Sequence, residues 1–439
     1  MPMLATVADD FTGASDQASM LAGAGVSSLL VLDEAFDVSS GHWQAITYAS
    51  RLRSIAPEQA RALGATLFAR AAGLQPRMIQ YKYCSTFDST PEGNIGPCLD
   101  VAMQTLGPLP GAVVVPALPV NGRTTYQGRH FVLGVPLDES PMRQHPLNPM
   151  TDANLVRWLG RQTQSPVGLV SYETVEKGPA AITDGLKGLW AEGIPYVVVD
   201  CLSQRHVRVI AQALWDQPFI SGSSALPMEL PGVWRKEGLL EPARQSHVPE
   251  GAPGDRHDAP VLALSGSCAA QTLRQVQCAR GFHLICVDLD TVIEGDTERE
   301  SRRLVARADE ALREGGRALV SSSQSPQDRA VSEARAKSAG LSPHELGRRI
   351  EGLMGEVARQ VLAHQAVLHL LVAGGETSGA VCQALGLRAV EILTEIAPGV
   401  PLCRSIDEPH TIIALKGGNF GGDDFFPRAA AAALGARWG

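Results

Sequence analysis

The chain is poor in aromatic residues, and its cysteines show no paired motif. Phe, Trp and Tyr make up 5% of the 439 residues, which disfavours an aromatic surface on which nucleic-acid bases stack. The eight cysteines are scattered without a C-x-x-C pair, a usage typical of reduced thiols rather than of a disulfide framework or a zinc site. An H-E-x-x-H motif is also missing, so the sequence leaves any metal ligands unassigned.

Long apolar runs and an excess of positive charge are missing as well. No run of about 18 apolar residues occurs, which excludes a typical transmembrane helix. The N-terminus lacks a basic segment followed by a long apolar one, so we expect no signal peptide and a cytoplasmic location. The net charge of −8 disfavours non-specific binding to nucleic acid or to an anionic membrane.

Two common nucleotide-binding motifs are absent. Without G-x-x-x-x-G-K-[ST] the chain is not a P-loop enzyme, and without G-x-G-x-x-G after a strand a dinucleotide site is disfavoured. The composition nevertheless suits a large folded enzyme, because 44% of the residues are hydrophobic and 19% are charged. A chain of this length is expected to form two or three domains.

Strand-like apolar runs alternate with helical patterns along the whole chain. This alternation predicts an α/β protein whose domains are each a mainly parallel sheet flanked by helices. A polar segment rich in Pro and Gly near residue 250 indicates a linker. We therefore predict a first domain over residues 1–245, a linker over 246–258 and a second domain over 259–439. Residues 121–150, rich in Pro, Gly and Arg, are expected to form long loops or a hairpin.

The chain opens on a short apolar strand, Leu4–Ala8, that ends in the adjacent carboxylates Asp9 and Asp10. A turn with Gly13 and then a helix are expected to follow. Ligands of open α/β sheets bind at the carboxyl ends of strands, and paired carboxylates there need a cation, a proton or a hydroxyl to relieve their repulsion. The alternative is that these side chains only cap the helix.

Other polar segments of the first half also follow strand-like runs. Residues 81–96 are dense in hydroxyl groups, suited to a polyhydroxylated ligand or, alternatively, to a capped loop. Arg53 follows the strand 45–49 and can grip a carboxylate by a bidentate pair, unless it is a solvated surface residue. Asn121 and Arg123 add an amide and a guanidinium after another strand.

In the second half, strands run into small-residue loops at three places. Glycine permits a close backbone approach, and a helix N-terminus favours a phosphate group. Lys416 can add a point charge to such a site. Each loop alone is more simply explained by an ordinary turn, but together they indicate phosphate or nucleotide binding at Ser265–Cys268, Gly374–Gly379 and Lys416–Gly422.

Taken together, these segments resemble the four-carbon acid sugar kinase family, and they occur in the family's order over nearly the whole chain. The segments that carry the resemblance are Ala8–Ala14, Arg51–Ser54, Lys82–Thr90, Asn121–Thr125, Ser265–Cys268, Gly374–Thr377 and Leu415–Gly421.

The resemblance implies an N-terminal domain that binds an acid sugar and a C-terminal domain that binds ATP. The implied enzyme is a phosphotransferase with an alcohol group as acceptor, which uses ATP and Mg²⁺ to phosphorylate the terminal C4 hydroxyl. Residues 85–97 are most similar to the 3-oxo-tetronate kinases, whereas Gly417 stands where that subgroup usually has Ser. A threonate or erythronate 4-kinase is the alternative, and a nucleotide-dependent oxidoreductase is a remoter one.

The resemblance also assigns roles to residues. Asp10 is the first candidate for the base that accepts the hydroxyl proton, with Asp9 and Asp88 as alternatives. The substrate-binding candidates are Asp9, Arg53, Ser85, Thr86, Asp88, Asn121 and Arg123. The ATP-binding candidates are Ser265, Ser267, Gly374, Gly375, Glu376, Thr377, Lys416, Gly417, Gly418 and Asn419. The partners are then small molecules, and the oligomeric state stays open, with a homodimer among the alternatives.

Overall fold

The structure, a computed structural model, describes residues 1–38, 42–145, 148–242, 259–323, 325–365, 368–407 and 411–435. The chain divides into two compact units. The first unit comprises Met1–Leu29 and Asp37–Arg244, and the second comprises Leu30–Phe36 and Gln245–Gly439. The expected linker, residues 246–258, lies outside the described residues. The domain boundaries given above therefore stay a prediction.

The first unit is built on a parallel sheet with the strand order β3-β1-β4-β11-β5-β10-β9. A small antiparallel sheet, β6-β7-β8, lies within residues 121–150. The strands are β1 (Leu4–Ala8), β3 (Ala45–Ala49), β4 (Met78–Lys82), β5 (Ala112–Val115), β6 (Arg123–Tyr126), β7 (Arg129–Val132), β8 (Val135–Pro136), β9 (Val167–Val170), β10 (Tyr196–Val199) and β11 (Phe219–Gly222). The strand β2 (Ser28–Val31) includes the boundary between the two units, which falls after Leu29.

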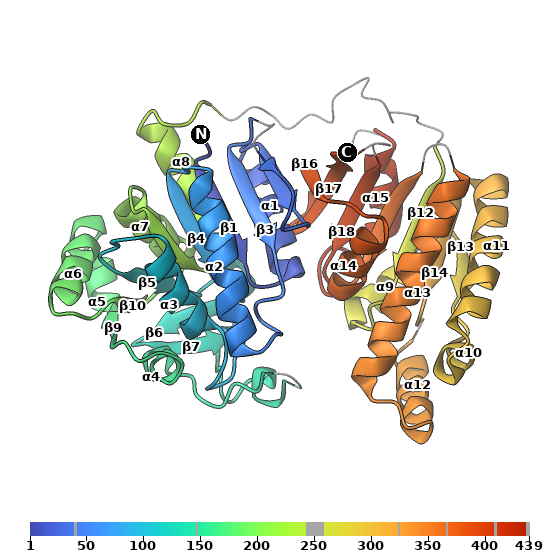
Figure 1. Ribbon diagram of the computed structural model, residues 1–439, viewed down its shortest axis with the longest axis horizontal. Coiled ribbons are helices and arrows are strands. Elements are labelled where there is room, and N and C mark those ends of the chain that lie inside the picture. The colour runs from blue at the N-terminus through green and yellow to red at the C-terminus, as the bar shows by residue number, and fades with distance from the viewer. Residues whose placement is uncertain are drawn as a thin grey trace. The chain divides into compact units, whose positions relative to one another are not determined.

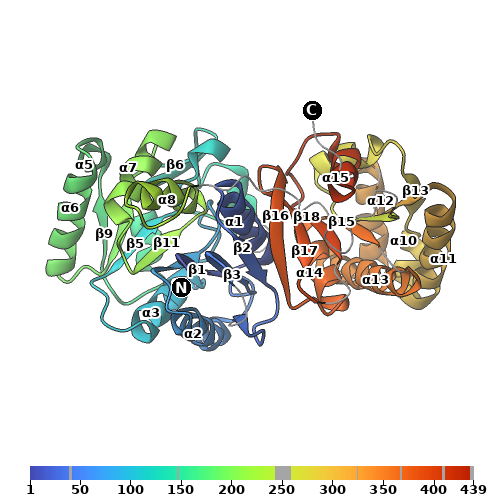
Figure 2. The same cartoon turned by 90° about the horizontal axis from the view of Figure 1, so that it is seen from above.

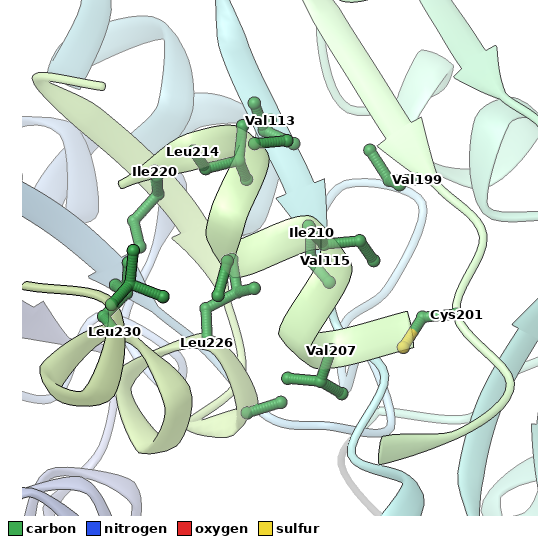
Figure 3. Close-up of a cluster of buried hydrophobic side chains, with 14 of the residues drawn as sticks. Val113, Val115, Val199, Cys201, Val207, Ile210, Leu214, Ile220, Leu226 and Leu230 are labelled. Atoms are coloured by element: carbon green, nitrogen blue, oxygen red, sulfur yellow. The ribbon is translucent and has the colours of Figure 1, made fainter. Parts of the chain in front are cut away.

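Helices cover both faces of the parallel sheet in the first unit. Figure 2 shows α1, α7 and α8 on one face and α2 and α3 on the other. In Figure 3, apolar side chains of α7 and α8 pack on β5, β10 and β11 and close a buried core. The helices are α1 (Phe11–Gly23), α2 (Pro57–Gly73), α3 (Ile95–Thr105), α4 (Leu155–Gly160), α5 (Tyr172–Glu176), α6 (Pro179–Ala191), α7 (Gln204–Leu214) and α8 (Ala225–Lys236).

The second unit has its own sheet, in the order β13-β14-β12-β15-β18-β17-β16. The first five strands in that order are parallel, and the hairpin of β16 and β17 adds an antiparallel edge. The strands are β12 (Val261–Ser265), β13 (His283–Cys286), β14 (Arg317–Ser321), β15 (His369–Ala373), β16 (Ala389–Ala397), β17 (Val400–Ser405) and β18 (Ile412–Lys416).

Helices α9 and α15 lie on one face of this second sheet, and α11, α13 and α14 lie on the other (Figures 1 and 2). The helices are α9 (Ala270–Gln277), α10 (Leu289–Glu294), α11 (Thr297–Gly315), α12 (Pro326–Ser338), α13 (Pro343–His364), α14 (Gly375–Ala384) and α15 (Phe425–Ala433). Each unit is thus a mainly parallel sheet between helices, so the predicted fold class is confirmed.

The boundaries of two helices differ from the sequence prediction. α1 begins at Phe11, directly after the carboxylate pair, because the side chain of Asp10 caps it by accepting the N–H of Gly13 at 2.9 Å. α14 begins at Gly375, so residues 375–379, expected as a loop, form the first turns of a helix. Residues 121–150 contain the hairpin of β6 and β7, as one of the two alternatives predicted, and β8 extends it to a small sheet.

Candidate functional site

The carboxyl ends of β1, β3 and β4 lie side by side in the first unit. Ala8, the last residue of β1, is opposite Ala49 of β3 and Lys82 of β4. The segments that follow these strands therefore meet at one edge of the sheet. This edge brings together Asp9, Asp10, Arg53 and Asp88, as the sequence predicts for chain segments that leave neighbouring parallel strands.

Arg53 links the carboxylates of this edge. Its Nε and Nη2 donate to the two carboxylate oxygens of Asp9 at 2.9 and 2.7 Å. Its Nη1 lies 3.0 Å from Oδ2 of Asp10 and 3.8 Å from Oδ2 of Asp88. The side chain of Asp9 is 1% exposed and that of Asp10 is 28% exposed. Of this adjacent pair, therefore, only Asp10 presents its carboxylate to the outside.

The surroundings push the pKa values of the two adjacent carboxyl groups in opposite directions. Burial raises the pKa of Asp9, although the Arg53 guanidinium opposes the rise. Burial alone would also raise the pKa of Asp10, but Arg53, Lys82 and the N–H of Gly13 together lower it below its usual value. Asp10 is therefore an ionised carboxylate at neutral pH.

The hydroxyl-rich loop after β4 contains a left-handed residue. Phe87 has φ of 54° and is fully buried, and its ring packs edge-on against Tyr83 with centroids 5.4 Å apart. Positive φ is costly for a bulky residue, so the surrounding contacts must hold it. Ser89 donates to the carbonyl of Phe87 at 2.8 Å and itself accepts from Trp158 at 3.1 Å. This turn fixes the position of Asp88.

A small cavity at this edge is lined by Asp9, Arg53, Asp88, Asn94 and Asn148, among other residues. Oδ1 of Asp88 and Oδ1 of Asn94 are buried, and neither has a hydrogen-bond partner. The amide nitrogen of Asn94 donates to two backbone carbonyls, one on each side of Arg53 in the chain. Only the side-chain oxygen of Asn94 is therefore without a partner. Buried acceptors without partners are costly. The cavity has room for about one water molecule, so it suits a single donor group such as a water or one hydroxyl of a ligand.

The remaining substrate-binding candidates lie at the loop after β4 and on the small sheet. The hydroxyl of Thr86 is 3.0 Å from Sγ of Cys84, and the carbonyl of Ser85 accepts from Nε2 of His130 at 2.8 Å. Asn121 ends a short 3₁₀ turn, and its carbonyl accepts a hydrogen bond from Nη1 of Arg123. Their binding roles stay predictions.

His130 is a positioning residue that the sequence pattern did not reveal. It is fully buried on β7, and its Nδ1 lies 3.0 Å from the hydroxyl of Thr125. Burial lowers its pKa to about 4, so the ring is neutral and its Nε2–H donates to Ser85. The small sheet thereby holds the hydroxyl-rich loop. Only the pairing of β6 with β7 could have indicated this contact.

In the second unit the three glycine loops converge at the ends of β12, β15 and β18. A Cβ placed on Gly266 would lie 2.3 Å from the hydroxyl oxygen of Thr377, and one on Gly374 would lie 2.7 Å from it. A Cβ on Gly418 would lie 2.8 Å from the hydroxyl of Ser267. The loops are therefore in contact at glycine positions, where a larger side chain would clash with the neighbouring loop.

The three glycine loops meet around the start of α14. Gly374, at φ of 131°, precedes this helix and gives it no side-chain cap, so the first N–H groups are open to an anion. Gly375 and the exposed Glu376 stand in its first turn. The hydroxyl of Ser265 is buried without a partner. These features fit the phosphate groups of a nucleotide.

Lys416 is buried beneath the last loop. Its Nζ donates to the hydroxyl of Thr272 at 2.9 Å and to the carbonyls of Gly417 and Gly418 at 2.9 and 3.1 Å. Burial lowers its pKa to about 7. The side chain therefore holds the loop from below, and the exposed Asn419 lies at the loop's outer side.

Three further residues contact this site, and no sequence motif indicates them. Thr272 donates to the carbonyl of Gly418 at 2.6 Å, and Gln275 donates to three successive carbonyls of residues 420–422. Both project from α9 at helical spacing, a pattern that is also typical of ordinary packing. Ser322 follows β14, its N–H donates to the carbonyl of Ser265, and its hydroxyl is buried without a partner.

Within the described residues, no group of three or more His, Cys, Asp or Glu side chains is arranged to hold a metal ion. None of the eight cysteines forms a disulfide bond. In the same part of the chain no helix has the length and apolar character needed to cross a bilayer.

Comparison with known proteins identifies the family. Residues 4–230 match the model of a sugar-binding N-terminal domain, and residues 262–426 match that of a nucleotide-binding C-terminal domain. The chain is 39% identical to the 3-oxo-tetronate kinase of Methylobacterium radiotolerans, over 97% of this chain and 98% of that protein. The chain belongs to the four-carbon acid sugar kinase family. The 3-oxo-tetronate kinase of Salmonella typhimurium is 37% identical, over 98% of this chain and 99% of that protein.

The fold of this family member is also found among solved structures. The Haemophilus influenzae protein HI1011 is 31% identical and superimposes with a TM-score of 0.80, over 98% of this chain and 100% of that one. The sugar-binding domain model covers the edge with Asp10 and Arg53, and the nucleotide-binding model covers the glycine loops. The two polar sites of this acid sugar kinase family member thus fall one in each domain.

Proposed function

We propose that the protein is an ATP-dependent kinase that phosphorylates the terminal C4 hydroxyl of 3-oxo-tetronate. Support comes from two sources. Relatives named 3-oxo-tetronate kinase match nearly the whole chain. The observation that carries the proposal is the cavity of the first unit, where two buried acceptors lack donors beside an ionised Asp10. A hydroxyl group of an acid sugar can supply such a donor.

Asp10 is the best-placed proton acceptor of the three carboxylates. Both oxygens of Asp9 are held by Arg53, and its side chain is 1% exposed. Asp10 is more exposed and is ionised. Phosphoryl transfer through a loose transition state needs a positioned acceptor more than a strong base. Asp88, whose Oδ1 lacks a hydrogen-bond partner and has Nδ1 of His145 at 3.9 Å, is the better candidate for binding a substrate hydroxyl.

Arg53 was expected to grip the substrate carboxylate, and that role stays a prediction. In this state two of its nitrogens bind Asp9 and the third faces Asp10. Its main effect is therefore to keep the carboxylates ionised and fixed. Orientation of this kind is a large part of what an enzyme contributes to transfer between bound substrates.

ATP is proposed to bind at the three glycine loops of the second unit. The uncapped start of α14 and the free hydroxyl of Ser265 fit its phosphate groups. Mg²⁺ would neutralise negative charge on the phosphate groups, and it needs only one or two protein oxygens because it keeps several waters. Asp423, one carboxylate near this site, is already paired with Gln271 and Arg274.

The test is a coupled ADP-release assay with 3-oxo-tetronate, D- and L-threonate and D-erythronate. We expect the highest kcat/KM with 3-oxo-tetronate, and ATP but not NAD should raise the melting temperature. Preference for threonate or erythronate would move the protein to the alternative subgroup. Turnover of none of these acids, with ATP still bound, would contradict the proposed substrate class.

A further inference from the structure

Lys82 is a buried cation at the end of β4. Its side chain is 4% exposed, and within the described residues no hydrogen bond or ion pair engages its Nζ. An ammonium group carries three donor hydrogens. Nζ of Lys82 is not among the described side-chain atoms that are closed off from solvent without a partner, so a ligand can reach it. The charge of Lys82 acts at longer range on both carboxylates: it opposes the rise in the pKa of Asp9 and contributes to the lowered pKa of Asp10. Its donors are therefore available to an oxygen ligand.

The ammonium lies beside the candidate base. A Cβ placed on Gly13 would lie 2.3 Å from Nζ of Lys82 and 2.5 Å from Oδ1 of Asp10, so both groups touch the same glycine. Gly13 stands in the first turn of α1, a helix of 13 residues whose N-terminus carries partial positive charge. The absence of a side chain at Gly13 thus leaves room for the ammonium at this point.

Lys82 and Arg53 differ in how many of their hydrogen-bond donors are already engaged. The guanidinium of Arg53 is taken up by Asp9 and Asp10, whereas the donors of Lys82 are open. We propose that Lys82 is a catalytic residue that binds an anionic oxygen of the reacting groups, either the carboxylate of the acid sugar or the phosphoryl group transferred to it. This inference rests on the proposed function.

The ligand of Lys82 must present anionic oxygens, and the reaction supplies two groups that do so. One is the carboxylate of the acid sugar. The other is the transferred phosphoryl group: O4 forms a bond to the γ-phosphorus, the bond from that phosphorus to the β,γ-bridging oxygen breaks, ADP leaves, and Asp10 takes the O4 proton. A cation next to Asp10 would then offset the charge on the phosphoryl oxygens.

Steady-state kinetics of Lys82→Met separates the two forms. If Lys82 binds the carboxylate, KM for 3-oxo-tetronate rises at least 10-fold and kcat changes little; if it binds the phosphoryl group, kcat falls at least 100-fold and KM is kept. Lys82→Arg should recover part of the loss. Lys187→Met, at an exposed lysine of α6, is the control. Both constants within twofold of wild type in Lys82→Met would overturn the proposal.

A labelling experiment on the wild-type chain avoids any folding defect of the variant. Amine acylation at Lys82 and Lys187 is measured by mass spectrometry with 3-oxo-tetronate, with its 4-phosphate and with inorganic phosphate. At least one anion should slow labelling of Lys82 fivefold or more and leave Lys187 unchanged. No protection by any of the three would overturn the inference. Failure of the wild type to turn over any acid sugar would instead contradict the proposed function, and the inorganic phosphate result would still decide the role of Lys82.

Discussion

Arg53 and Asp9 form a two-bond ion pair at the end of β1, with contacts of 2.9 and 2.7 Å and an Asp9 side chain that is 1% exposed. A carboxylate buried in this way depends on its partner, because desolvation is otherwise uncompensated. The pair also connects two chain segments that are far apart in sequence. It is thus a structural element of the site as well as an electrostatic one.

Replacement of Arg53 by Met should therefore destabilise the protein. Loss of one partner of a buried ion pair costs about 3–5 kcal/mol, which urea unfolding would detect as a lower free energy of unfolding. Adding Asp9→Asn removes the orphaned charge, so the double variant should regain part of that loss. A double variant no more stable than Arg53→Met would contradict this account of the pair.

Asp10→Asn tests the proton acceptor. Asn caps a helix about as well as Asp, so the N–H of Gly13 keeps its partner, and the melting temperature should fall only by what the ion pair of Asp10 with Arg53 contributes. Removal of a positioned proton acceptor costs about 10²–10⁴-fold in rate, and kcat with saturating substrates should fall accordingly. If kcat stays within a few-fold of wild type, Asp10 is not the proton acceptor.

Gly374→Ala should damage the nucleotide site selectively. The residue has φ of 131°, and its new methyl group would lie 2.7 Å from the hydroxyl of Thr377. KM for ATP should rise at least 10-fold, whereas binding of the acid sugar, measured by calorimetry without nucleotide, should be unchanged. Gly352→Ala is the matched control, since its methyl group meets nothing within 4 Å in helix α13. Equal effects of the two substitutions would contradict the assignment.

Lys416 makes stability depend on pH. Its pKa is about 7 in the folded chain against 10.5 for an ordinary lysine. Below pH 7 both states are protonated, and the cost of burying the charge is fully present. As pH rises above 7 the unfolded chain holds the extra proton, so the free energy of unfolding increases, by at most about 1.4 kcal/mol per pH unit.

Denaturant unfolding of wild type and Lys416→Met at several pH values measures this effect. The stability of the wild type relative to the variant should rise from about pH 7 to about pH 9, because other titrating groups cancel in the difference. A difference that does not change over this interval would show that Lys416 stays protonated in the folded state.

Much of the fold could be predicted because buried parallel strands are continuous apolar runs. The predicted strands Leu4–Ala8 and 45–49 agree with β1 and β3 at every residue. The strand β11, Phe219–Gly222, was missed, because four residues that end in Ser and Gly do not differ from a turn. Residues 30–36 belong to the second unit, where Leu32 and Asp33 both donate to the carbonyl of Arg388. Because this contact is between segments far apart in the chain, the local sequence does not indicate it.

For the candidate site, the sequence predicted which residue types stand at the strand ends, since parallel strands share one edge. It could not predict their pairing, which depends on side-chain torsions. Arg53 turns toward Asp9, Lys416 points beneath its loop, and Lys82 lies against Gly13. His130 reaches Ser85 only because β7 pairs with β6.

The central claim is that a phosphoryl group moves from ATP to the C4 oxygen of 3-oxo-tetronate. Phosphorus NMR of a reaction containing wild-type protein, ATP, Mg²⁺ and this acid measures the result directly. The account predicts a sugar phosphate whose resonance is split into a triplet by the two C4 protons. A doublet, which marks a phosphate on the C2 oxygen, or consumption of ATP to ADP and free phosphate alone, would contradict it.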